Sequence, residues 1–111
     1  MVFVLAAPAY GQIVGDPAKG RTVYMNSCVF CHGSDGKGSG QMAALLPVKP
    51  ANFTDCRITG EDSIEIAEGT IREGGPYQGI SKVMPPFKGL LTEQQIADAA
   101  SYVKSLCTDP D

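Results

Sequence analysis

Two cysteines and the only histidine of the chain stand close together, in the order Cys28-Val29-Phe30-Cys31-His32. Thiols at this spacing on one helical turn can form thioether bonds with the two vinyl groups of a single porphyrin, and the adjacent imidazole can then bind the iron. The motif therefore predicts that one haem c is attached covalently through Cys28 and Cys31, with His32 as an axial ligand.

Two other kinds of site use cysteines at a similar spacing. A thioredoxin-like dithiol belongs in a βαβ setting, which this sequence does not indicate. A zinc site could use Cys28, Cys31, Cys56 and Cys107, but structural zinc sites usually pair their cysteines within two to four residues. Neither Cys56 nor Cys107 has such a neighbour. The haem interpretation is therefore favoured over both.

The second axial ligand would be a methionine, because the chain has no second histidine. Met1 lies in the N-terminal apolar run and Met25 on the attachment side of the motif, which leaves Met42 and Met84. Two prolines follow Met84 directly and would hold a weak thioether ligand in place at small entropic cost. Both methionines remain candidates on this reasoning, and the prolines favour Met84.

Size and charge limit the classes of partner. A chain of 111 residues suggests one domain, and a core this small often needs an internal support such as a buried haem. The net charge of −3 argues against nucleic-acid binding, which needs a clustered basic surface. No segment is long and apolar enough to span a membrane. We therefore expect protein partners and a monomer.

The N-terminus indicates export to the periplasm. Residues 2–9 form a short apolar run that ends in Ala7-Pro8-Ala9, like the end of a signal peptide. We therefore interpret 1–9 as a truncated signal-peptide remnant, 10–15 as a linker and 16–111 as the folded domain. An even number of remaining cysteines in an exported protein suggests a Cys56–Cys107 disulfide, the alternative being two buried free thiols.

Three main helices are predicted, joined by long loops. Asp16 and Pro17 are a favourable helix start, and that helix should run to about residue 26. Apolar residues at helical spacing predict a second helix over 61–72. Thr92 and Gln95 form a capping box before a third, strongly periodic helix. Because no strand is indicated, the expected fold class is all-α. Helices joined by such long loops usually need a central group to fold around.

Four motifs in this order resemble the class I monohaem cytochromes c, over Asp16 to Cys107. They are Cys28-Val29-Phe30-Cys31-His32-Gly33, Asp35-Gly36-Lys37-Gly38, Pro50-Ala51-Asn52-Phe53-Thr54-Asp55 and Met84-Pro85-Pro86-Phe87. The resemblance implies the cytochrome c fold, with the first and last helices crossing at Gly20 and Tyr24 packing near Tyr102. It also implies that Met84 is the second axial ligand.

The resemblance further implies contacts to the haem and its ligands. The carbonyl of Pro47 would accept a hydrogen bond from the second nitrogen of His32. Some members use a tryptophan to contact a haem propionate, and this chain has none. Asn52, Arg57 and Tyr77 are the candidates to replace it.

A haem with two protein axial ligands suits one-electron transfer better than catalysis. The expected function is therefore a soluble electron shuttle between a respiratory donor and an acceptor protein, not an enzyme. Two alternatives stay open. A labile Met84 would allow catalysis or ligand binding at the iron, and the chain could instead be a docked subunit of a larger oxidoreductase complex.

Overall fold

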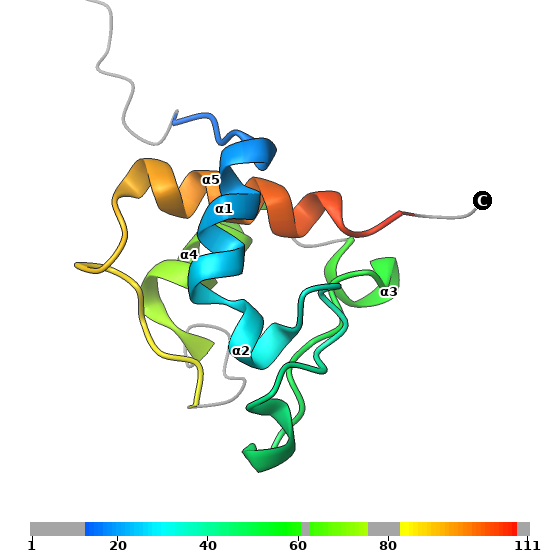
Figure 1. The fold of residues 1–111 in the computed structure, drawn as a ribbon. Helices are drawn as coiled ribbons and strands as arrows, with labels where there is room; N and C mark the ends of the chain where they lie inside the picture. The colour runs from blue at the N-terminus through cyan, green and yellow to red at the C-terminus, as the bar shows by residue number, and fades with distance from the viewer. Residues whose placement is uncertain (1–12, 61–62, 76–82, 109–111) are drawn as a thin grey trace, which may run out of the picture.

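The described residues form helices joined by loops (Figure 1). The structure, a computed structural model, describes residues 13–60, 63–75 and 83–108, so the predicted signal remnant and most of the linker lie outside it. The elements are α1 (Pro17–Ser27), α2 (Val29–His32), the 3-10 turn η1 (Ala43–Leu45), α3 (Cys56–Thr59), α4 (Ile64–Glu73) and α5 (Glu93–Ser105). Within these ranges no strand forms beyond an isolated bridge between Lys88 and Leu91, and the all-α prediction is confirmed.

Side-chain caps fix where the three main helices begin. The Asp16 carboxylate accepts the N–H groups of Ala18 and Lys19, so α1 starts at Pro17 as predicted. Thr92 and Gln95 form the predicted capping box at the start of α5. Ser63 caps α4, which therefore begins at Ile64, later than the predicted residue 61. Residues 61–62 lie outside the described part of the chain.

The first and last helices cross, as the resemblance implies (Figure 1). Gly20 is buried at the crossing, where an added Cβ would overlap the backbone of Asp98 on α5. The rings of Tyr24 and Tyr102 pack nearby with their centroids 5.2 Å apart. The absence of a side chain at Gly20 therefore lets two backbones approach closely.

The start of α1 is tied to α5 through Asp98, a carboxylate with only 3% exposure. Its Oδ1 atom accepts the backbone N–H of Asp16 (2.8 Å) and the side-chain amide of Gln94 (2.9 Å). The same Gln94 amide also donates to the carbonyl of Val14. These bonds satisfy a buried polar group and fix residues 14–16 on α5.

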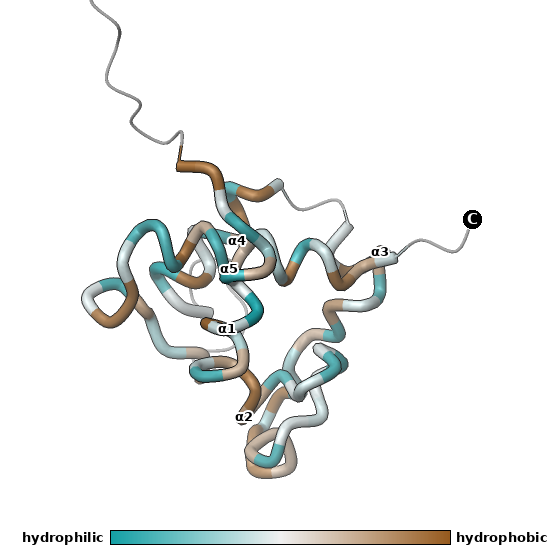
Figure 2. The backbone as a smooth tube through the Cα atoms, turned by 45° about the horizontal axis from the view of Figure 1, so that its top comes forward, coloured by the Kyte–Doolittle hydropathy of each residue, from teal (hydrophilic) through white to brown (hydrophobic). Residues whose placement is uncertain are grey.

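The core lies between α4 and α5. Ile71, Ile96, Ala99 and Ala100 are buried together, and Met84 is among the partly buried side chains that pack against them. Figure 2 shows hydrophobic positions interspersed with hydrophilic ones along the chain. Every helix in the described ranges is too short or too polar to reach across a bilayer.

Candidate functional site

The Cys-x-x-Cys-His motif forms a separate helical turn directly after α1. The backbone N–H of Cys28 donates to the Tyr24 carbonyl (2.8 Å) and closes α1, while the carbonyl of Cys28 accepts from His32 and opens α2. Gly33, at φ +81, ends this turn. The hydroxyl of the fully buried Tyr24 donates to the Gly33 carbonyl at 2.5 Å. The turn that carries both cysteines is therefore fixed to α1 at each end.

Met84 reaches the same region from the segment after α4. Its carbonyl accepts the backbone N–H of Gly75 (3.1 Å), just beyond the end of α4. Three residues later, the N–H of Phe87 donates to the carbonyl of Ile71 inside α4 (3.0 Å). The Met84 segment therefore runs along the last turn of α4 and is bound to it at Met84 itself and at Phe87.

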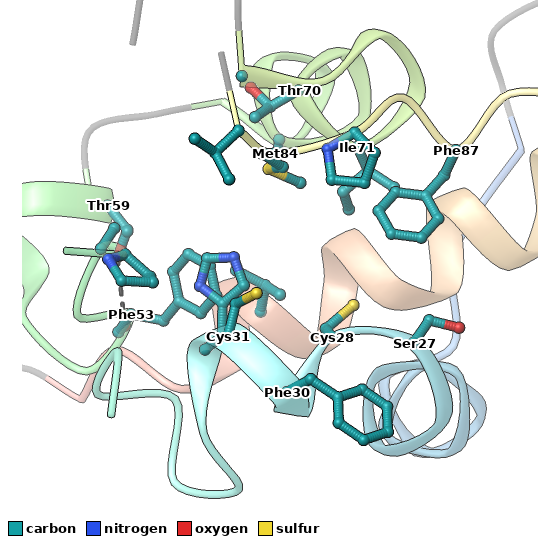
Figure 3. A pocket seen from close by; sticks show the side chains of 18 of the residues that line it. Ser27, Cys28, Phe30, Cys31, Phe53, Thr59, Thr70, Ile71, Met84 and Phe87 are labelled. Atoms are coloured by element: carbon teal, nitrogen blue, oxygen red, sulfur yellow. Dashed lines mark hydrogen bonds between the residues drawn. The ribbon is translucent and has the colours of Figure 1, made fainter. Parts of the chain in front are cut away.

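One cavity brings the four predicted haem-binding side chains together. It has a volume of about 320 Å³, at the lower end of the range of small-molecule and cofactor sites, and its lining is mostly apolar. Cys28, Cys31, His32 and Met84 all line it. In Figure 3 the sulfurs of Cys28 and Cys31 enter from one side and Met84 from the opposite side. Met42 is 44% exposed and does not line this cavity.

His32 is placed as a neutral metal ligand. Burial lowers the pKa of its imidazole to about 4, an effect that the backbone of Ala51 only partly offsets. At neutral pH the ring is therefore uncharged, which is the form that binds metals. The Phe53 ring stacks on it, with centroids 4.5 Å apart and an interplanar angle of 22°. The buried Nδ1 atom of His32 finds no hydrogen-bond partner in the described part of the chain.

The Cys28 thiol differs from a reactive thiol. Burial, with a smaller effect of Cys31, raises the pKa of the Cys28 thiol to about 11, so it is protonated at neutral pH. Reactive cysteines instead have lowered pKa values in electropositive surroundings. An apolar cavity with an unpartnered imidazole nitrogen, two thiols and an opposing thioether fits a haem. A bound macrocycle would supply the apolar surface that this small core lacks.

Of the four implied pocket contacts, three lie away from the cavity lining and one falls outside the described residues. Pro47 is exposed and does not line the cavity, and the expected bond from His32 to its carbonyl is not formed. Asn52 does not line the cavity either, because its Oδ1 accepts two local hydrogen bonds from Thr54. Tyr77 lies outside the described residues.

Arg57 is the fourth, and it too lies away from the cavity lining. Its guanidinium pairs with the carboxylate of Asp55 two residues away (2.9 Å), and its side chain is 90% exposed. It does not line the cavity. The segment instead contributes Phe53, the residue stacked on His32. The only sequence signal for Phe53 was its place within the family motif around Asn52.

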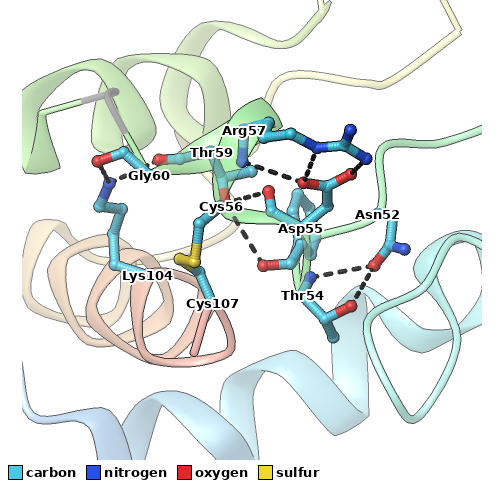
Figure 4. Close-up of a disulfide and its surroundings, with 10 residues drawn as sticks. Asn52, Thr54, Asp55, Cys56, Arg57, Thr59, Gly60, Lys104 and Cys107 are labelled. Atoms are coloured by element: carbon cyan, nitrogen blue, oxygen red, sulfur yellow. Dashed lines mark hydrogen bonds and ion pairs between the residues drawn. A yellow bond between two sulfur atoms is a disulfide. The ribbon is translucent and has the colours of Figure 1, made fainter. Parts of the chain in front are cut away.

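A disulfide joins Cys56 to Cys107 (Figure 4). It ties the first residue of α3 to the end of α5, with the two Cα atoms 5.1 Å apart. Beside it, the ammonium group of Lys104 donates to the carbonyl of Thr59 at 2.6 Å. The bridge uses two of the four thiols that a four-cysteine zinc site would need. No cluster in the described ranges brings together three His, Cys, Asp or Glu side chains for a metal ion.

Comparison with known proteins assigns the family. The family model for cytochrome c matches residues 17–107. The cbb3-type cytochrome c oxidase subunit FixP of Bradyrhizobium diazoefficiens is 38% identical over 92 residues, covering 82% of this chain and 28% of FixP. Cytochrome c-554(548) of Halomonas halodenitrificans is 32% identical, covering 82% of this chain and 96% of that protein.

Solved structures agree with these sequence matches. The KustC0563 c-type cytochrome superposes with a TM-score of 0.65 at 27% identity, covering 80% of this chain and 98% of that one. The chain thus corresponds to nearly all of two small cytochromes but to little more than a quarter of FixP, at 28% of its length. It therefore belongs to the cytochrome c family.

Proposed function

We propose that this cytochrome carries single electrons between redox partner proteins through one haem c, bound by Cys28 and Cys31 with His32 and Met84 as axial ligands. The observation that supports this most is the shared cavity. Two thiols and an imidazole line one side, and a thioether from a distant part of the sequence lines the other.

Each of these side chains has a distinct task. A haem bound here supplies a one-electron ferric/ferrous couple. Thioether bonds to Cys28 and Cys31 would prevent loss of the cofactor, and neutral His32 would offer its lone pair to the iron. The thioether of Met84 favours the ferrous state and raises the reduction potential relative to a second histidine. The apolar walls exclude water, which also tunes the potential.

The way in which Met84 is held supports electron transfer over catalysis. Catalysis or ligand binding at the iron needs a free coordination position. Here backbone hydrogen bonds from Gly75 and Phe87 fix the segment to α4, and two prolines stiffen it. A ligand held in this way keeps nearly the same position when the iron changes its oxidation state.

We further propose a soluble, monomeric protein of the periplasm, with residues 1–9 as the signal remnant. The disulfide supports this location, because such bonds persist mainly in oxidising compartments. The match to FixP favours a second candidate, in which this domain is part of a larger oxidase or dehydrogenase. Size-exclusion chromatography of a native extract distinguishes the two by the size of the species that carries the haem.

Separate substitutions of two methionines test whether Met84 is the second ligand. Met84→Ala should open one axial position, so that carbon monoxide binds the ferrous haem rapidly and the reduction potential falls. Met42→Ala is the matched control, because Met42 is exposed and does not line the cavity. Rapid carbon monoxide binding by the wild-type protein at neutral pH, or an unchanged potential in Met84→Ala, would contradict the proposal.

A further inference from the structure

Gly74 lies where the end of α4 meets the backbone of the Met84 segment. It is buried, and its φ of +88 ends the helix. A Cβ at this position would lie 2.8 Å from the carbonyl oxygen of Met84 and 3.0 Å from the nitrogen of Pro86. In proteins, a Cβ atom essentially never lies within 3.0 Å of a heavy atom from a non-neighbouring residue. The close approach of α4 to the Met84 segment therefore depends on the absence of a side chain at Gly74.

Backbone hydrogen bonds fix the segment on both sides of this contact. The N–H of Gly75 donates to Met84, that of Phe87 donates to Ile71 (3.0 Å), and that of Lys88 donates to Arg72 (3.2 Å). The segment from Met84 to Lys88 is thus held along the last turn of α4. A displacement at Gly74 would have to break these bonds or move the whole segment.

Pro85 and Pro86 determine how such a displacement would spread. Their rings fix φ near −65°, so the backbone between Met84 and Phe87 has few ways to bend. A side chain at Gly74 would press on the Met84 carbonyl and on both prolines at once. Because the prolines cannot absorb the change locally, it should reach the Met84 thioether.

Two ion pairs near the same place are weaker candidates for this role. Lys88 pairs with Glu73, and their side chains are 62% and 39% exposed. Arg72 pairs with Glu93, and their side chains are 31% and 54% exposed. Exposed pairs of this kind contribute little, because water and salt screen them. The close backbone contact at Gly74 is therefore the stronger determinant.

We propose that Gly74 is a positioning residue for Met84: the close approach that it permits holds the thioether where it can ligate the iron. This inference rests on the proposed role of Met84 as an axial ligand. Gly74 itself would not touch the haem. It acts through the backbone of the segment that carries the ligand.

A matched pair of glycine substitutions tests the idea in the haem-loaded protein. Gly74→Ala adds a Cβ against the Met84 segment. Gly89→Ala adds one at a similar φ of +84, where nothing lies within 4 Å. The control thus also forces alanine to a positive φ, five residues beyond Met84, without the crowding. Haem content and far-UV circular dichroism confirm that both variants are loaded and folded.

The readouts are the rate of carbon monoxide binding to the ferrous haem and the reduction potential. In Gly74→Ala we expect the Met84-dissociated population, and with it the binding rate, to rise about tenfold, equivalent to 1.4 kcal/mol. The potential should fall. Gly89→Ala should resemble the wild-type protein in both measurements.

The outcomes separate this inference from the ligand assignment. If Gly74→Ala matches Gly89→Ala while Met84→Ala changes both readouts, Met84 is the ligand and Gly74 does not position it. If Met84→Ala changes neither the rate of carbon monoxide binding nor the reduction potential, Met84 is not the ligand. The proposed role of Gly74 then has no basis.

A second measurement does not depend on the Gly74 variant folding. Hydrogen exchange of the Gly75 and Phe87 amides is compared between wild-type and Met84→Ala proteins. Retained protection in Met84→Ala is expected if α4 holds the segment. Loss of protection at both amides would show that the bond to iron holds it instead, and would overturn the inference.

Discussion

Removal of the Cys56–Cys107 disulfide should destabilise the folded protein strongly. The bridge spans 51 positions of the sequence. In the chain-entropy model, a closed loop of this length restricts the unfolded ensemble enough to stabilise the native state by about 4 kcal/mol. The proposed haem attachments at Cys28 and Cys31 lie outside this loop, so they should not reduce the effect. Cys56→Ser/Cys107→Ser should therefore lower the free energy of unfolding by about that amount.

Equilibrium unfolding of the haem-loaded protein in guanidinium chloride measures the difference. The double variant should unfold at a lower midpoint than the oxidised wild-type protein. Wild-type protein whose disulfide has been reduced with a thiol is the matched control, because it keeps every side chain and loses only the bridge. A difference below about 1 kcal/mol in both comparisons would refute the reasoning, since the loop would then cost little entropy to close.

Two further substitutions test smaller parts of the structure. Tyr24→Phe leaves the buried carbonyl of Gly33 without its donor, so the free energy of unfolding should fall by about 1–3 kcal/mol, whereas Tyr102→Phe keeps the ring contact and should cost less; equal losses would contradict this. Glu93→Gln should cost less than about 1 kcal/mol, because the pair with Arg72 is exposed. Hydrogen bonding to Arg72 lowers the pKa of Glu93 below its ordinary value of 4.5, so the pair stabilises the fold at neutral pH, and this contribution disappears as the carboxylate is protonated. The difference between the two proteins should therefore be largest at pH 7 and shrink as the pH falls and Glu93 is protonated, and a difference independent of pH would contradict the assignment.

The helices that could be predicted have local signals. Asp16 caps α1 through its own side chain, and Thr92 with Gln95 caps α5, so both starts are encoded within a few residues. The predicted start of α4 at residue 61 was too early, because Ser63 caps the helix and Ile64 is the first apolar residue of its periodic face. The short α3 has no periodicity to detect. It depends on a local cap by Asp55 and on the long-range bond from Cys56.

The side chains that we propose bind the haem could be picked out from the sequence, because the motif places three of them within five residues. Which other side chains line the cavity could not be predicted, because local and distant partners compete for them. Asn52 bonds to Thr54, and Arg57 pairs with Asp55, each two residues away. Such local bonds form at small entropic cost and keep both side chains away from the cavity. The stacking of Phe53 on His32 needs the folded chain and has no local signal.

The intact mass of the denatured protein tests the central claim most directly. The protein would be exported together with a haem-maturation system, and its mass compared with that of a Cys28→Ser/Cys31→Ser variant. We predict a mass equal to the polypeptide plus one haem that survives denaturation, and no such addition in the variant. A colourless protein, or a haem that separates from the chain on denaturation, would contradict covalent attachment and with it the account of this site.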